Sequence, residues 1–148
     1  MDPNPQAADA APLWTLGYIS VAQPGLDRAD LKHILHVSHR DNPPRQVTGL
    51  LVHCCGNFMQ VLEGPKPGVH EIFRRIRASP LHSTIRVLFD EPLPEREFGD
   101  WAMFCKEVDE AEFRPVLTQP QGSSRRMLAH FWRAWDTPLR GAGDPGPA

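Results

Sequence analysis

The sequence contains few cysteines, one tyrosine and no long apolar run. The shortage of cysteines and of apolar runs excludes particular classes of protein and of site. Its three cysteines lack any CxxC spacing and two of them are adjacent, so we expect neither a disulfide framework nor a structural zinc site. No run approaches the roughly 18 apolar residues of a membrane-spanning helix. The first residues also lack the basic and apolar regions of a signal peptide. We therefore expect a soluble cytoplasmic protein.

A strong excess of charge is missing as well. Lysine and arginine together number 16 and aspartate and glutamate 18, which gives a formal net charge of −2. Proteins that bind nucleic acid through their charge usually carry a basic excess. We therefore expect no nucleic-acid partner, and nothing in the pattern predicts a membrane partner. The length of 148 residues corresponds to about one domain.

Proline, by contrast, is abundant, and many of its 16 copies lie with alanine and glycine near the two ends of the chain. Segments of this composition have little to bury. We therefore predict disordered tails over 1–12 and 138–148, with the folded part of the chain between them.

Hydrophobic periodicity predicts strands and helices in alternation. Runs rich in aromatic and β-branched residues predict strands over 14–21, 46–53, 58–63, 84–89 and 100–105. Apolar residues at helical spacing predict one helix that starts after Asp27 and stops before Pro43. They predict another helix between Gly64-Pro65 and Ser79-Pro80.

The order of these elements is that of a ferredoxin-like α+β fold, βαββαβ, with one extra strand. Right-handed crossovers place the first and third strands side by side in the middle of a mixed sheet, with both helices on one face. Tyr18 then lies next to Gln60. The other face needs a cover, which C-terminal helices would supply, although their apolar stripe could instead form a subunit contact. That stripe consists of Leu128, Phe131, Trp132 and Trp135.

Three groups of polar side chains are candidate sites, and each has a simpler interpretation. Residues 53–55, His-Cys-Cys, could bind a metal, but they are typical of a strand end that enters a turn. His33, His36 and His39 resemble a metal cluster, but the first two lie opposite the apolar stripe of their helix and should face solvent. Arg75 is either a solvated surface residue or a partner for an anion held between the helices.

Two further residues resist a purely structural account. Tyr18 is the only tyrosine in the chain and belongs to a central strand, while Gln60 lies between Phe58 and Leu62 on one strand face. A buried polar group without a partner costs about 1–3 kcal/mol. The two side chains therefore bond each other or the backbone, or they serve a ligand.

Five short motifs resemble those of the BLUF domain, a blue-light sensor that uses flavin. In chain order they are LGYIS, DN at 41–42, VTGLL, FMQVLEGP and DWAM. The resemblance covers about 13–107 and implies a ferredoxin-like domain that holds FAD non-covalently, with the ring system between the two helices. A C-terminal helical extension over 108–137 would follow it.

The resemblance also implies roles for individual residues. Tyr18 resembles the electron and proton donor, and Gln60 resembles the amide between that tyrosine and the flavin N5 and O4 atoms. Trp101 and Met103 resemble the switch positions of the last strand and should share one face of it. The flavin-contacting positions hold Asn42 at the pyrimidine edge, Ile34, Ile76 and Phe58 as apolar walls, and Arg75, Asp41 and His82.

The sequence departs from the family pattern at two places. Asp41 stands where asparagine or histidine is common, and Ser79 stands where aspartate is common. A carboxylate cannot donate a hydrogen bond as an amide does, and it could repel the phosphates of the cofactor. These departures concern how tightly the flavin is held rather than the photochemistry.

The implied function is that of a blue-light photoreceptor rather than an enzyme. Light would drive reversible electron and proton transfer among Tyr18, Gln60 and the flavin, and would leave Gln60 rearranged. The signal would then pass to an unidentified partner protein or through a change in a homo-oligomer. Two alternatives stay open: a ferredoxin-like interaction module that has lost flavin, and a flavin-dependent redox enzyme, for which the chain shows no nicotinamide motif.

Overall fold

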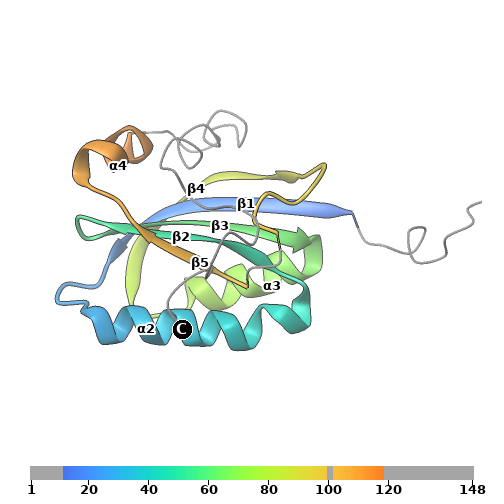
Figure 1. The fold of residues 1–148 in the computed structure, drawn as a ribbon, viewed down its shortest axis with the longest axis horizontal. Coiled ribbons are helices and arrows are strands. Elements are labelled where there is room, and N and C mark those ends of the chain that lie inside the picture. The colour runs from blue at the N-terminus through green and yellow to red at the C-terminus, as the bar shows by residue number, and fades with distance from the viewer. Residues whose placement is uncertain (1–11, 100–101, 119–148) are drawn as a thin grey trace, which may run out of the picture.

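A mixed sheet of five strands with helices on both faces forms the part of the chain that the computed structural model describes, residues 12–99 and 102–118 (Figure 1). The strands are β1 (Leu13–Ala22), β2 (Thr48–Cys54), β3 (Asn57–Pro65), β4 (His82–Pro92) and β5 (Phe104–Glu107). The helices are α2 (Arg28–Asp41), α3 (Lys66–Arg77) and α4 (Glu110–Leu117), with a short 3₁₀ turn, η1 (Pro43–Arg45), after α2. The predicted tails, apart from Pro12, and the apolar stripe at 128–135 lie outside the described residues.

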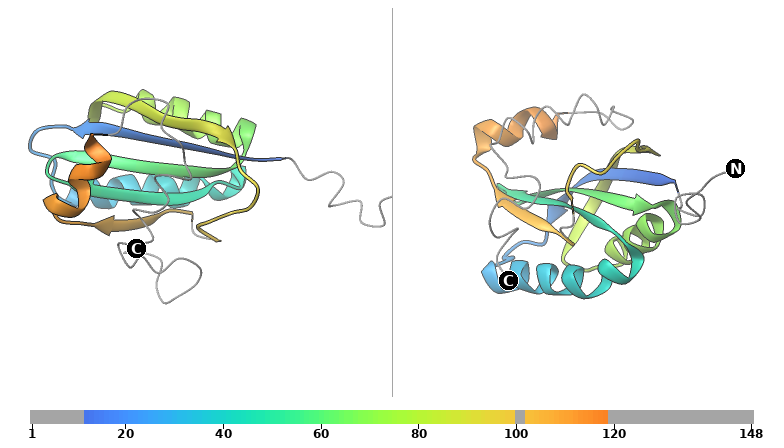
Figure 2. Two further views of the ribbon diagram at one scale, coloured as in Figure 1. Left: turned by 90° about the horizontal axis from the view of Figure 1, so that it is seen from above. Right: turned by 45° about the vertical axis from the view of Figure 1, so that its right-hand side comes forward.

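The strands β1 and β3 are neighbours in the middle of the sheet, as the sequence predicts. The strand order is β4-β1-β3-β2-β5, and every pair is antiparallel except β2 and β5, which run parallel. The register of β1 and β3 places Tyr18 directly opposite Gln60. Helices α2 and α3 lie on one face of the sheet and α4 lies on the other (Figures 1 and 2). The ferredoxin-like α+β fold with an extra strand is therefore confirmed.

Alternation along the central strands divides the buried side chains between two cores. On β3, Phe58 belongs to the core beneath α2 and α3, whereas Met59 belongs to the core on the other face. Phe113 and Val116 of α4 pack into that second core, so α4 supplies part of the cover that this face needs. Within the described ranges, no helix has the length and apolar character that crossing a bilayer requires.

Helix α2 begins where the sequence predicts, because Asp27 caps it. The Asp27 carboxylate accepts a hydrogen bond from the backbone N–H of Asp30, and the Asp30 carboxylate accepts one from the N–H of Asp27. This reciprocal pair satisfies N–H groups that the start of a helix would leave unpaired. At the other end, Pro43 and Pro44 turn the chain into η1. These two ends fix the position of the last turn of α2, whose side chains contribute to the functional site.

Strand β5 begins later than predicted. The sequence predicts a strand over 100–105, whereas the strand starts at Phe104 and pairs in parallel with residues 50–53 of β2. The physical reason lies just before it. The Ala102 carbonyl accepts a hydrogen bond at 2.8 Å from Asn42, which follows α2, and the Met103 carbonyl accepts one at 3.2 Å from His39 in the last turn of α2, instead of joining the ladder with β2.

This difference affects the two predicted switch residues. Met103 precedes β5 instead of lying in it, and its relation to Trp101 stays a prediction. Trp101 itself lies outside the described residues. Only Met103 can therefore be related to the rest of the site.

A buried carboxylate fastens the connection between β4 and β5 to the sheet. Glu63 on β3 is 1% exposed, and its carboxylate accepts hydrogen bonds from the Thr48 hydroxyl at 3.0 Å and from the backbone N–H groups of Glu97 and Phe98, both at 2.8 Å. Burial raises the pKa of Glu63, while these hydrogen bonds and the charge of Arg96 act in the opposite direction. Glu63 therefore anchors the connection that leads to β5.

Loss of this anchor should cost more stability than loss of an exposed glutamate. Glu63→Ala removes the acceptor of two backbone N–H groups and one hydroxyl, and we expect the free energy of unfolding to fall by about 3 kcal/mol, because an unpaired buried donor costs about 1–3 kcal/mol. Urea denaturation measures the change. The control Glu95→Ala, at an exposed position, should change it by less than about 0.5 kcal/mol. Equal losses in the two variants would contradict the anchor.

Candidate functional site

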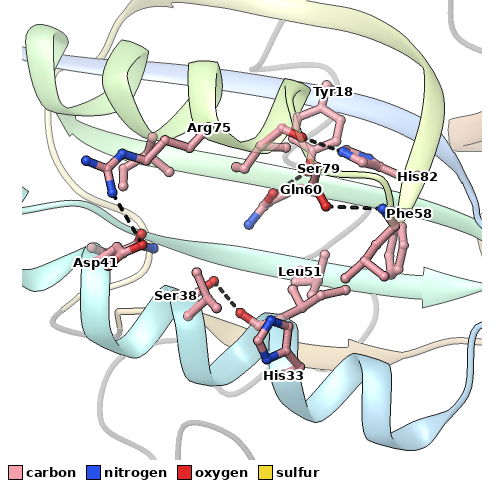
Figure 3. Close-up of a pocket in the computed structure, with 16 residues that line it drawn as sticks. Tyr18, His33, Ser38, Asp41, Leu51, Phe58, Gln60, Arg75, Ser79 and His82 are labelled. Carbon is pink, nitrogen blue, oxygen red and sulfur yellow. Dashed lines mark hydrogen bonds and ion pairs between the residues drawn. The ribbon is translucent and has the colours of Figure 1, made fainter.

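A cavity of about 230 Å³ lies between α2, α3 and the sheet (Figure 3). Its walls come from both helices and from β1, β2, β3 and the start of β4, so it exists only when these elements pack together. The lining residues are Tyr18, His33, Ile34, Val37, Ser38, Asp41, Asn42, Leu51, Phe58, Gln60, Ile72, Arg75, Ile76, Ser79, Leu81 and His82. All residues predicted as photoactive or flavin-contacting are among them. Their roles toward a flavin stay predictions.

The phenol of Tyr18 is hydrogen-bonded to the side chain of Gln60 at the sheet side of this cavity. The Tyr18 hydroxyl donates to Gln60 Oε1, and the two residues are only 2% and 3% exposed. Burial raises the pKa of Tyr18 above its ordinary value of about 10, so the phenol stays protonated and remains a donor. The ring is held from the sides by Phe73 and His82, with centroid separations of 5.5 and 5.9 Å.

The other end of the Gln60 amide contacts the segment before β5. Gln60 Nε2 lies 3.5 Å from Met103 Sδ, to which it donates a weak hydrogen bond. A thioether only accepts, which requires the nitrogen to face Met103 and the oxygen to face Tyr18. Gly49 on β2 makes room for this arrangement, since a Cβ there would lie 2.1 Å from the Val61 carbonyl oxygen and 3.3 Å from Met103 Cε. Gln60 thus connects the phenol to Met103.

Asn42, at the end of α2, both holds the backbone around it in place and lines the cavity. Its Nδ2 donates to the Ala102 carbonyl at 2.8 Å, and its backbone carbonyl accepts from the N–H groups of Arg45 and Val47, both at 3.0 Å. Asn42 is therefore held in place at the end of α2 and lines the cavity.

An ion pair between the two helices compensates the unusual carboxylate of Asp41. Arg75 of α3 extends toward Asp41 of α2, with 3.6 Å between its NH1 and Asp41 Oδ2 (Figure 3). Arg40 donates two hydrogen bonds to the same carboxylate, at 2.7 and 3.1 Å. The hydrogen bonds from Arg40 lower the pKa of Asp41, and the charges of Arg75 and Arg45 act in the same direction. The negative charge of Asp41 at the cavity is therefore balanced by neighbouring arginine side chains.

His82 braces the cavity from behind Tyr18. Its Nε2 lies 2.8 Å from the Ile76 carbonyl and must donate to it, because a carbonyl only accepts. Its Nδ1 lies 2.7 Å from the Ser20 hydroxyl. Both ring nitrogens are therefore engaged within the protein, so His82 offers a ligand the face or edge of its ring rather than a free nitrogen.

Several lining residues are missing from the sequence-based prediction. Leu51 pairs with Gln60 in the β2–β3 register, and Ile72 lies one helical turn before Ile76. Strand alternation on β2 and helical spacing on α3 carry the signal that could have found them. His33 is exposed, as expected, yet it also lines the cavity. Across residues 12–99 and 102–118, no three histidine, cysteine, aspartate or glutamate side chains converge in a way that could hold a metal ion.

Comparison with known proteins identifies the family. The sequence profile of the BLUF family, described as sensors of blue light using FAD, matches residues 13–104. The chain belongs to the BLUF family. This BLUF chain is 31% identical in sequence to BlrB, a BLUF protein whose dark-state structure matches it with a TM-score of 0.70 over 88% of this chain and 99% of that chain.

Larger proteins contain similar domains. The chain is 37% identical over 102 residues to the photoactivated adenylate cyclase subunit beta of Euglena gracilis. The matched segment covers 68% of this chain but only 12% of that protein. A structure of Klebsiella pneumoniae BlrP1 with FMN and cyclic diGMP has a TM-score of 0.64 and 26% identity, and the match covers 84% of this chain and 36% of that one. The chain thus spans a small fraction of the curated relative's length.

BLUF proteins sense blue light through a bound flavin, and the cavity fits such a ligand on chemical grounds. A flavin ring is a flat aromatic surface with hydrogen-bonding groups along one edge, so it needs apolar walls and a few polar partners. Ile34 of α2 and Ile76 of α3 line the cavity from the two helices, and the amides of Gln60 and Asn42 line it as polar groups. The chain therefore contains a flavin-binding blue-light sensor domain with the ferredoxin-like fold.

Removal of the Asn42 side chain should weaken flavin retention. Asn42→Ala removes both the acceptor at the cavity and the hydrogen bond to Ala102, and we expect flavin to bind roughly tenfold more weakly or worse. Equilibrium dialysis with added flavin measures the dissociation constant. Asn57→Ala is the matched control, since it also removes an amide that donates to a backbone carbonyl, but at the β2–β3 turn. Equal affinities of Asn42→Ala and the unaltered protein would contradict the role of Asn42.

Proposed function

We propose that this chain is a blue-light photoreceptor without enzymatic activity of its own, which binds FAD non-covalently and uses Tyr18 and Gln60 as its photoactive pair. The observation that carries the proposal is the hydrogen bond from the Tyr18 hydroxyl to Gln60 Oε1 beside the cavity. The same amide contacts Met103 through Nε2. One side chain therefore links the place where light is absorbed to the segment before the edge strand β5.

The flavin ring would be held between α2 and α3 by residues of both helices and the sheet. Ile34, Ile76 and Phe58 would cover it with apolar surface. Asn42 Oδ1 would accept a hydrogen bond from a ring N–H at the pyrimidine edge. Arg75 has donors for a ring carbonyl or for a phosphate, at the expense of its contact with Asp41.

Bound flavin supplies the absorption of blue light and a strongly oxidising excited state. Tyr18 is the electron donor of the pair, and its buried, protonated phenol also supplies a proton. That proton leaves Tyr18 along the hydrogen bond to Gln60 Oε1. The electron and the proton both return to Tyr18, so no net redox product accumulates. The cycle also forms no covalent bond between the protein and the flavin.

Gln60 converts this transient transfer into a change of structure. In the arrangement described above, its oxygen accepts from Tyr18 and its nitrogen donates to Met103 Sδ. A rotated amide would present its oxygen to Met103, and a thioether cannot donate to it. The rotation therefore removes the hydrogen bond to Met103 and shifts the population of the segment before β5. Dark recovery is the reverse rotation.

The type of flavin and the recipient of the signal are the remaining parts of the proposed function. FAD is supported by the description of the family, and FMN, present in the BlrP1 structure, is the alternative. Chromatography of the flavin released from the purified protein distinguishes the two. We propose that the signal passes to a separate partner protein or changes the oligomeric state of the chain, in the cytoplasm.

Substitution of either member of the pair should abolish the photocycle but not the colour. Tyr18→Phe and Gln60→Leu should each still bind yellow flavin. Each should lose the photoproduct, a small red shift of the flavin absorption that a new hydrogen bond from the rearranged Gln60 to flavin O4 would cause, because Tyr18→Phe removes the phenol and Gln60→Leu removes the amide. A light-minus-dark difference spectrum measures the photoproduct. Gln23→Leu makes the same chemical change at an exposed turn and should keep it.

The same spectra discriminate the alternatives. A normal red-shifted product in Tyr18→Phe would refute the photoactive pair. A bleached, adduct-like spectrum of the unaltered protein would indicate a different photochemistry. A protein that is colourless and takes up no flavin would support an interaction module that has lost its cofactor.

A further inference from the structure

Two adjacent cysteines lie at the tip of the β2–β3 hairpin. Cys54 is the last residue of β2, and Cys55 is the first residue of the turn. Their sulfur atoms are 2.8 Å apart. All three cysteines of the chain lie within the described residues, and none of them forms a disulfide. The two thiols are therefore in direct contact but not bonded.

The backbone of the turn holds the two sulfur atoms together. Cys55 and Gly56 have φ angles of 55° and 75°, the left-handed values of a two-residue hairpin turn. Asn57 Nδ2 donates to the Cys55 carbonyl at 3.0 Å, and the Ala22 N–H donates to the Gly56 carbonyl at 2.8 Å. The turn is thus fastened from β3 and from β1, which limits how far the two thiols can separate.

The two thiols differ in their surroundings. Cys54 is 5% exposed and belongs to the core that includes Phe113 of α4, whereas Cys55 is exposed. Burial raises the pKa of Cys54 to about 12, and the contact with Cys55 and the carboxylates of Glu110 and Asp109 act in the same direction. Cys54 therefore stays a protonated thiol, and Cys55 is the sulfur that a dissolved oxidant can reach.

We propose that Cys54 and Cys55 form a reversible oxidation site, with hydrogen peroxide as the oxidant and a disulfide between adjacent residues as the product. The Cys55 thiolate attacks a peroxide oxygen, so an S–O bond forms, the O–O bond breaks and one water leaves. The Cys54 sulfur then displaces the hydroxyl from Cys55 as a second water, and an S–S bond forms. The two thiols lose two electrons and two protons, which reduce one peroxide to two waters.

The spacing of the backbone makes this bond a switch rather than a permanent link. Consecutive Cα atoms are about 3.8 Å apart, less than the roughly 4.4–6.8 Å across ordinary disulfides, so the ring stores strain and is reduced easily. Formation of the disulfide also acts on the end of the β2–β3 hairpin, which contains a residue that lines the cavity. Cys54 pairs with Asn57 and His53 pairs with Phe58, whose ring lines the cavity.

The test compares the reduced, flavin-loaded protein in the dark before and after an equimolar addition of hydrogen peroxide. Mass spectrometry should find the loss of two hydrogen atoms on the peptide that contains Cys54 and Cys55, and dithiothreitol should restore the original mass. Cys54→Ser and Cys55→Ser should each abolish the loss. Cys105→Ser, a half-buried cysteine on β5, is the matched control and should keep it.

A second measurement does not depend on how well the serine variants fold. Phenylarsine oxide bridges two neighbouring thiols, so the unaltered reduced protein should bind one equivalent, and peroxide treatment should prevent this binding. Oxygen adducts on Cys55 without a disulfide, or no uptake of the arsenical, would overturn the proposal. The result is independent of the photoactive pair, because Tyr18→Phe should oxidise as the unaltered protein does.

Discussion

A hydrogen bond between a buried phenol and a buried amide joins the two central strands beside the cavity. Neither group tolerates burial without a partner, since an unpaired polar group costs about 1–3 kcal/mol. Tyr18 and Gln60 meet because β1 and β3 are antiparallel neighbours in the middle of the sheet, in a register that sets the two residues opposite one another. A slip of one residue would point one of them toward the core on the other face.

Gln60 is also the point where the cavity is connected to the edge of the sheet. Its amide has an acceptor on one side and a donor on the other, and the donor reaches Met103. Just before β5, the carbonyls of Ala102 and Met103 accept hydrogen bonds from Asn42 and His39 at the end of α2. A change in one amide can therefore alter a segment that is held by individual hydrogen bonds rather than by a strand ladder.

Local patterns in the sequence contain much of the fold and of the site. Strand alternation and helical spacing are set by residues close together in the chain, so the helix that starts after Asp27 and the hairpin at Cys55 are readable without a structure. The strand order follows from the handedness of crossover connections, and it brings Tyr18 to Gln60. The motif resemblance selected cavity-lining residues on both helices, because short motifs preserve identity and spacing along the chain.

Partners that come from distant segments of the chain cannot be predicted from local patterns. The sequence identified Asp41 as an unusual charge, but the approach of Arg75 from α3 depends on how the two helices pack. Glu63 has no local signal that it binds the N–H groups of 97–98. The start of β5 differs from the sequence prediction for the same reason, because side chains of His39 and Asn42 at the end of α2 bind the carbonyls before it. Such contacts join separate elements, and their geometry arises only when the chain has folded.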